Sequence, residues 1–201
     1  LNELVRTAQV VIAASPTVMG SYSGLLKLFL DGLPEAALLG KTGIPLMIAR
    51  QARHALAASV LGGRLLPPFQ FGEGGGPGGW VILHEPEVLL GEDLPVPDLA
   101  GWRKERFPGM PAENWFSVAP DWVCEILSPG TVGKDRARKM PVYARHAVKH
   151  LWIIDPAVKT LEVFRLESGK WLLIETVAEN ARVRAEPFVE LELDLDSLWW
   201  D

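Results

Sequence analysis

The sequence predicts an α/β fold. An early strand, helix and strand follow one another within about forty residues, the length of a βαβ unit. Further along, a basic helix has strand patterns on both sides of it. The composition agrees with a folded domain, because 48% hydrophobic and 22% charged residues are typical of a chain that packs a core. With 201 residues the chain forms one sizeable domain or two small ones, and intrinsic disorder is excluded.

The early elements fall within residues 1–50. Residues 9–14 are a short β-branched run that predicts a buried strand, ended by Ser15-Pro16. Residues 23–33 repeat apolar side chains at helical spacing, and residues 40–49 add a turn and another apolar run. Such a βαβ unit normally contributes a parallel strand pair to an α/β sheet.

The later part begins with a loop and then becomes strand-rich. The glycines of residues 72–79 predict a flexible surface loop, because a phosphate-binding loop would end in Lys-Ser or Lys-Thr and follow a strand. A hairpin turn is predicted at Ser168-Gly169. Strands are predicted over residues 80–84, 87–90, 94–102, 115–127, 150–155, 160–165 and 170–176, and a helix over 134–148. This part is therefore expected to be a mixed sheet, with antiparallel strands before and after one helix.

Charge is distributed unevenly around the net value of −5. Residues 134–149 hold six Lys or Arg against one acid, whereas residues 186–201 hold six acids and no base. A local basic segment binds polyanions whatever the net charge, although a solvated helix face has the same composition.

The chain is expected to be cytoplasmic and to have no membrane segment. Its single cysteine, Cys124, cannot form an internal disulfide, and no leader peptide opens the chain. The longest apolar runs are far shorter than the roughly 18 to 20 residues of a membrane-spanning helix.

Two carboxylates are the first candidates for chemistry. Alternation along residues 122–127 places Glu125 on an apolar strand face between Val123 and Leu127, where a charge needs a partner or a metal. Asp98 lies in a second apolar segment. Two carboxylates on neighbouring strands, with a backbone carbonyl, would form an oxygen site suited to Mg²⁺ or Mn²⁺. A buried ion pair explains the same residues equally well.

The basic helix supplies the next candidates. Lys139 and Tyr143 are four residues apart and face the same way, with Arg136 one turn earlier. A lysine beside a metal would orient water or stabilise a phosphate, while arginines would hold a nucleic-acid backbone. A solvated basic face is the alternative. Pro141 predicts a kink or a helix start.

Residues from about 54 to 200 resemble the Uma2 family of endonucleases, within the PD-(D/E)XK or restriction-endonuclease-like superfamily. The stretches that carry the resemblance are HALAASVLGG, LLPPFQFG, GGWVILHEPEVLLG, VPDLAGWR, APDWVCEILSPGT, DRARKMPVYARHAVKHLWIIDP, TLEVFRL and RAEPFVELELDLDSLW, in the expected order. The resemblance implies that residues 51–201 form a restriction-endonuclease-like mixed sheet flanked by helices.

The same resemblance implies roles for individual residues. Asp98 would be the first metal ligand, Glu125 the second and the carbonyl of Ile126 the third, around Mg²⁺ or Mn²⁺. The lysine that the superfamily keeps two residues after the glutamate is Leu127 here, which makes Lys139 the candidate catalytic lysine.

Other residues would assist at the same site. Tyr143 would accompany Lys139, and His54 would tune a metal-bound water or contact phosphate, with an ordinary hydrogen-bonded helix histidine as the alternative. Nucleic-acid contacts would come from Lys134, Arg136 and Arg138.

Residues 1–50 do not fit that family. The segment VVIAASPTVMGSYSGLLKLFLDGLPEAALLGKTGIPLMIA resembles the middle of an NAD(P)H-dependent FMN reductase of the flavodoxin-like type, with its Ser-Pro turn, Ser-Gly-Leu-Leu-Lys helix and Gly-Lys turn. The serine-rich phosphate loop of that family would precede Leu1, so flavin binding is not expected. Both resemblances are explained by any one of three origins: a gene fusion, a misjoined reading frame or a fragment at a gene junction.

The leading function is a divalent-metal-dependent endonuclease that hydrolyses phosphodiester bonds in DNA. Its domain would cover residues 51–201, preceded by a reductase-type βαβ fragment over 1–50, and a homodimer is one compatible assembly. The alternatives are a flavin-binding, FMN reductase-like protein and a non-catalytic nucleic-acid-binding module on the nuclease fold.

Overall fold

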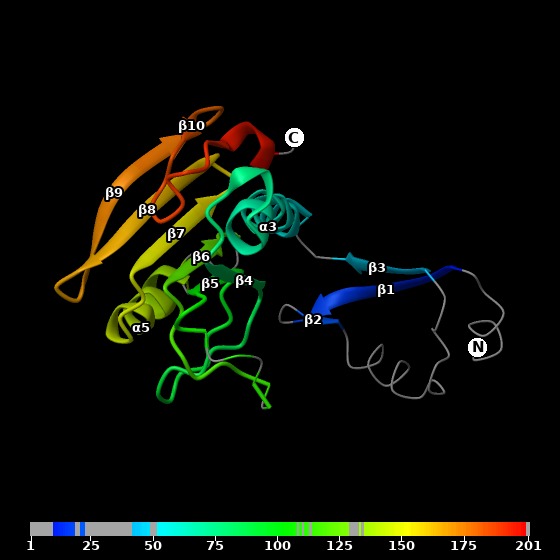
Figure 1. Ribbon diagram of the computed structural model, residues 1–201, viewed down its shortest axis with the longest axis horizontal. Helices are drawn as coiled ribbons and strands as arrows, with labels where there is room; N and C mark the ends of the chain where they lie inside the picture. Colours follow the sequence, from blue (N-terminus) through cyan, green and yellow to red (C-terminus); the bar gives the residue numbers. More distant parts are fainter. Residues whose placement is uncertain are drawn as a thin grey trace. The chain divides into compact units, whose positions relative to one another are not determined.

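The computed structural model describes residues 10–18, 21–22, 42–48, 52–107, 109, 111–112, 114–128, 133 and 135–199, with side chains from Leu56 onward except at Asp135 (Figure 1). The chain divides into two compact units, Leu1–Ala52 and Arg53–Asp201. The six-stranded sheet and both candidate carboxylates belong to the second unit.

The described part of the first unit is a small sheet in the order β2-β1-β3. Strand β1 (Val10–Val18) pairs parallel with β3 (Thr42–Ile48) and antiparallel with the short β2 (Ser21–Tyr22). The parallel pair confirms the strand pairing that a βαβ unit predicts. The predicted strand end at Ser15-Pro16 is wrong, because β1 continues through both residues, which pair with Met47 and Ile48 of β3. The helix predicted over residues 23–33 lies outside the described residues.

The second unit is built on one mixed sheet in the order β4-β5-β6-β7-β8-β9. Its strands are β4 (Trp80–His84), β5 (Leu99–Arg103), β6 (Trp122–Ile126), β7 (His150–Asp155), β8 (Thr160–Glu167) and β9 (Lys170–Ala178). The pair β6·β7 is parallel and the other neighbouring pairs are antiparallel. A parallel pair needs a crossover, which here contains the π-helical turn η3 (Asp135–Lys139) and helix α5 (Met140–Arg145).

Two apolar clusters cover the two faces of this sheet. Helix α3 (Ala52–Leu65) contributes Ala57, Leu61 and Leu65 to a cluster that includes every second residue of β6, Cys124 among them. Helix α5 contributes Val142 and Tyr143 to the other cluster, together with the intervening β6 residue Val123 and, just beyond the strand, Leu127. The alternation predicted for β6 is therefore confirmed, and α5 covers the face that carries Glu125.

Four tryptophans are core residues. Trp80, Trp102, Trp122 and Trp152 are at most 1% exposed. Three of them surround Phe188, whose ring centroid lies 4.9 to 5.7 Å from theirs. Such aromatic packing adds to the free energy of burial and explains these side chains without a nucleic acid.

Several elements match their predicted bounds, and two strands are shorter. The strand predicted over residues 87–90 is replaced by isolated bridges at Val88 and Leu90, and the helix predicted over 134–148 ends at Arg145. Strands β4 and β7 coincide with the predictions, and the hairpin turns at Ser168-Gly169. Of the strands predicted over 94–102 and 115–127, only β5 and β6 form. Pro95, Pro97 and Pro120 lie in the segments that fail, and proline cannot donate a ladder hydrogen bond.

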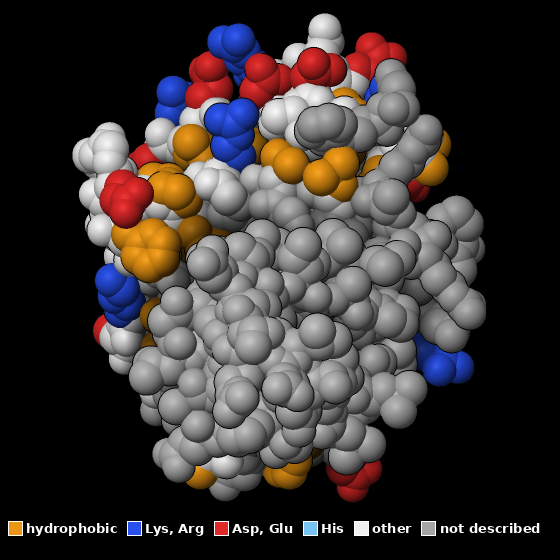
Figure 2. Space-filling model, turned by 90° about the vertical axis from the view of Figure 1, so that its right-hand side faces the viewer, with side chains coloured by type: hydrophobic (Ala, Val, Ile, Leu, Met, Phe, Trp, Pro, Cys, Tyr) orange, Lys and Arg blue, Asp and Glu red, His pale blue; other side chains and the backbone are white. Residues whose placement is uncertain are grey.

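The C-terminal segment closes over the α3 face. Strands β10 (Arg182–Val183) and β11 (Leu193–Asp194) form a two-stranded sheet, followed by the 3₁₀ turn η4 (Leu195–Leu198). Charged side chains of both signs gather along the top of the molecule in Figure 2, and in this segment Arg182 and Arg184 pair with Glu192. No helix in the described part of the chain is long and apolar enough to cross a membrane.

Two glycines provide a matched test of this packing. A Cβ at Gly76 would lie 2.4 Å from the Cα of Pro68 and 2.5 Å from its carbonyl oxygen, so Gly76→Ala should lower the free energy of unfolding by about 1 to 3 kcal/mol. Gly63 lies inside α3 with nothing within 4 Å of such a Cβ, so Gly63→Ala should raise it by about 0.5 to 1 kcal/mol. Urea denaturation measures both, and equal effects of the two substitutions would contradict the packing described.

Candidate active site

The strand register brings the two predicted carboxylates together. Leu99 of β5 pairs with Cys124 of β6, so Asp98, just before β5, comes beside Glu125. Asp98 is half-buried, and its Oδ2 accepts a 2.6 Å hydrogen bond from the backbone N–H of Ile126. That bond ties the start of β5 to the end of β6 and fixes the Asp98 carboxylate next to Glu125.

Glu125 is buried, with 1% of its surface exposed, and two residues of the crossover bind its carboxylate. The Tyr143 hydroxyl donates a 2.6 Å hydrogen bond to Oε1. The Lys139 ammonium lies 2.7 Å from Oε2. These contacts confirm that Lys139 and Tyr143, four residues apart, face the same way.

Lys139 also reaches the chain that leads to Asp98. Its Nζ donates a 2.9 Å hydrogen bond to the carbonyl of Val96, two residues before Asp98. Lys139 is the last residue of η3, and Pro141 lies in the first turn of α5, where its missing N–H is tolerated. The predicted helix start at Pro141 is thus confirmed, and a π-helical turn of the kind frequent at functional sites precedes it.

The electrostatics of Glu125 depend on its depth. The pKa of Glu125 is raised to about 8, because the effect of burial, with a further contribution from the charge of Asp98, outweighs the lowering by Lys139 and Tyr143. Burial likewise raises the pKa of the Cys124 thiol well above its ordinary value, with both carboxylates adding to the effect. Cys124 is therefore a small apolar residue on the opposite sheet face, whereas burial disfavours the charged form of Glu125 and Lys139 favours it.

The oxygen atoms around Lys139 Nζ are of the kind that a hard divalent cation prefers. They include a carboxylate oxygen of Glu125 and the carbonyl oxygen of Val96, and Asp98 adds a second carboxylate next to Glu125. Mg²⁺ commonly uses one or two protein carboxylates and keeps several waters. Within the described residues no group of three or more His, Cys, Asp or Glu could hold a metal ion. The donor set fits Mg²⁺ or Mn²⁺ and does not resemble a histidine or thiolate site.

The remaining predicted site residues stand apart from this cluster or lie outside the described residues. Arg136 is exposed and forms an ion pair with Glu162, and Arg138 is exposed. Ile126 contributes its N–H to Asp98, and the role predicted for its carbonyl stays a prediction. Lys134 and the side chain of His54 are not among the described parts of the chain.

Val96 takes part in the site although nothing in its residue type predicted this. A backbone carbonyl carries no residue-type signal, and Lys139 follows Val96 by 43 residues along the chain. The neighbouring Pro97 and Asp98 were the only local indication that this segment approaches the site.

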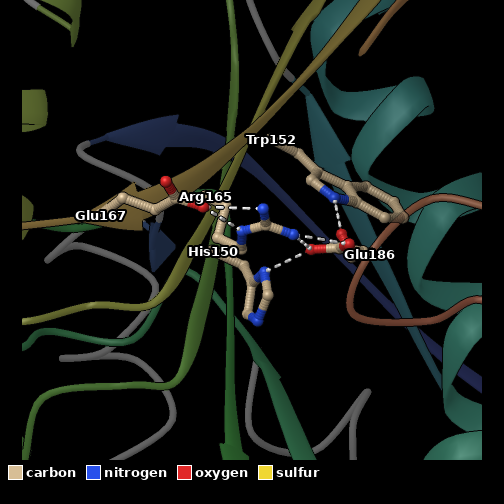
Figure 3. Close-up of polar contacts among 5 residues, drawn as sticks. All are labelled: His150, Trp152, Arg165, Glu167 and Glu186. Carbon is tan, nitrogen blue, oxygen red and sulfur yellow. Dashed lines mark hydrogen bonds and ion pairs between the residues drawn. The ribbon is translucent and has the colours of Figure 1, made fainter. Parts of the chain in front are cut away.

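A second polar cluster lies at the other end of the central strands (Figure 3). Arg165 of β8 lies between Glu186 and Glu167, with hydrogen bonds of 3.0 Å and 2.7 Å. His150, paired with Trp122 at the start of β6 and β7, has its Nδ1 3.8 Å from Glu186. Burial lowers the pKa of His150. Arg165 joins strand β8 to the C-terminal segment through its hydrogen bond to Glu186.

Comparison with known proteins agrees with this fold and site. The chain is similar to a crystal structure described as a "putative nuclease" from Anabaena variabilis, with a TM-score of 0.57 and 25% identity, over 76% of this chain and 83% of that one. The fold is thus that of a restriction-endonuclease-like nuclease, as the sequence resemblance predicted. The Uma2 family model, described as "Putative restriction endonuclease", matches residues 46–196, about three quarters of the chain. The chain belongs to the Uma2 family.

The first part of the chain has a separate similarity. A family model described as NADPH-dependent FMN reductase matches residues 1–61. An FMN reductase (NADPH) of Escherichia coli is 44% identical over 56 residues, which cover 28% of this chain and 29% of that enzyme. The chain thus spans less than a third of that relative.

The Tyr143 hydroxyl tests the geometry around Glu125. In Tyr143→Phe the buried Oε1 loses its donor while the ring and its packing remain, so the free energy of unfolding should fall by about 1 to 3 kcal/mol. Urea denaturation measures the change, with Glu92→Gln, at an exposed side chain, as the control. A Tyr143→Phe protein as stable as the wild type would mean that the hydroxyl does not bond to buried Glu125.

Proposed function

We propose that the unit Arg53–Asp201 is a divalent-metal-dependent endonuclease that hydrolyses phosphodiester bonds in DNA. The observation that carries the proposal is buried Glu125, held by Lys139 and Tyr143 next to Asp98. An ion pair that served stability alone is better placed near the surface, because burying the charge of Glu125 costs several kcal/mol. Membership of the Uma2 family supports the nuclease class.

Each residue of the site has a role that follows from its charge or its hydrogen bond. Asp98 and Glu125 would hold Mg²⁺ or Mn²⁺, which when bound supplies a Lewis acid for the phosphate and an acidified water. Tyr143 keeps the Glu125 carboxylate in one orientation through its bond to Oε1. Lys139 places a positive charge where negative charge develops on the phosphate.

The basic side chains of η3 are suited to hold the nucleic acid. Arg138 is exposed, and Arg136, although paired with Glu162, keeps 40% of its side chain accessible. Such residues position a phosphodiester backbone without reading sequence. The substrate is accordingly proposed as DNA bound through its phosphates, and Lys134 is proposed as a further contact.

Cleavage of plasmid DNA by the full chain tests this function. Activity should require Mg²⁺ or Mn²⁺ and be lost in EDTA, and Glu125→Gln, Asp98→Asn and Lys139→Met should each lower the rate by at least about 10²-fold, because each removes a charge from the reacting phosphate's surroundings. Glu92→Gln, at an exposed acid, is the matched control.

Two results would contradict the proposal. One is cleavage by Glu125→Gln at the wild-type rate, and the other is cleavage that persists in EDTA. DNA binding without metal-dependent cleavage would instead identify a non-catalytic nucleic-acid-binding module on the same fold.

A flavin-dependent function is the second candidate, because the 44% identity to an FMN reductase is specific. The matched segment covers only 29% of that enzyme. We therefore expect no FMN binding at micromolar concentration, measured by quenching of flavin fluorescence, with the Escherichia coli reductase as the positive control. A stoichiometric FMN complex would reverse the order of the two candidates.

A further inference from the structure

We infer that Lys139 fills the cation position of this site in the metal-free protein, and that its ammonium has to leave Glu125 when a divalent cation binds. The inference rests on the proposed metal site and specifies how the chain itself controls access to it. It concerns one contact, between Lys139 Nζ and Glu125 Oε2, which measures 2.7 Å.

The two oxygens of Glu125 have different partners. Oε1 accepts from Tyr143, whose side chain is fully buried in the apolar cluster under α5. Oε2 accepts from Lys139, whose side chain is 26% exposed. The Tyr143 contact is therefore on the closed side of the carboxylate and the Lys139 contact on the side open to solvent, from which a metal ion would enter.

The ammonium occupies the oxygen set that suits a hard cation. Its partners are a carboxylate oxygen and the Val96 carbonyl, with Asp98 two residues further along. A divalent ion that enters at Oε2 competes with the ammonium, because both are cations attracted to the same oxygen atoms and like charges at one oxygen repel each other. Lys139 has the means to withdraw, since a lysine is a point charge on a flexible four-carbon stem.

Withdrawal leaves the lysine in a useful place. The backbone of Lys139 stays fixed at the junction of η3 and α5, so Nζ swings within the length of its own side chain. A phosphate bound at the metal would lie on the same solvent side, where the released ammonium can contact its oxygens. One residue then serves as counter-ion of Glu125 before metal binding and as phosphate ligand afterwards.

Amine labelling of the full chain tests the exchange directly. A lysine-selective acylating reagent is applied with and without Mn²⁺, and mass spectrometry gives the modified fraction at each lysine. Labelling at Lys139 should rise several-fold with Mn²⁺, while Lys149, whose side chain is 63% exposed, should not change.

Calorimetry provides a second readout. Lys139→Met removes the competing ammonium, so the Mn²⁺ dissociation constant should fall by on the order of 10-fold, as expected for one lost charged hydrogen bond. Lys149→Met, the control, should bind as the wild type does.

The outcomes separate this inference from the proposed function. If the wild type binds Mn²⁺ but Lys139 labelling stays constant, or Lys139→Met binds no more tightly, the exchange is wrong and the metal site stands. If the wild type binds no Mn²⁺, both are overturned.

Discussion

The arrangement of this unit depends on one carboxylate that is buried in an apolar face of the sheet. Glu125 lies between Val123 and Leu127 in a cluster of otherwise apolar side chains. An unpaired charge there would cost several kcal/mol, a large part of the about 5 to 15 kcal/mol by which domains are stable. The chain therefore brings a hydroxyl and an ammonium to Glu125 from the helix above.

The topology explains how those groups arrive. Strands β6 and β7 are parallel, so the chain has to cross over between them, and the crossover helix α5 lies on the face that Glu125 occupies. On the other edge of β6, the antiparallel β5 starts just after Asp98. The carboxyl end of β6 is thus the place where strand, crossover and preceding loop meet, which is where open α/β sheets commonly bind ligands.

The sequence predicted those features of the site that depend on local periodicity. Alternation placed Glu125 on the strand face of Val123 and Leu127, and helical spacing placed Lys139 and Tyr143 together. The contacts that close the site join residues far apart in sequence: Ile126 follows Asp98 by 28 residues, and Lys139 follows Val96 by 43. Periodicity carries no information on contacts between residues so far apart in sequence. The predicted strand bounds near the prolines were wrong because a hydrophobic pattern does not show where a backbone N–H donor is missing.

Leu127 affects the charge of the site through packing. The cation beside Glu125 is Lys139, at the start of the helical segment that Leu127 packs against, and not a lysine at position 127. Leu127 shares the Glu125 face, is 4% exposed and packs in the cluster with Val142 and Tyr143. A lysine there would be anchored by the strand itself. Lys139 instead depends on how α5 is seated, and α5 is seated by Val142, Tyr143 and the Leu127 side chain beneath them. The strand position that holds no charge therefore contributes to the packing that keeps Lys139 in place, and the chemistry of the site is tied to the stability of one short helix.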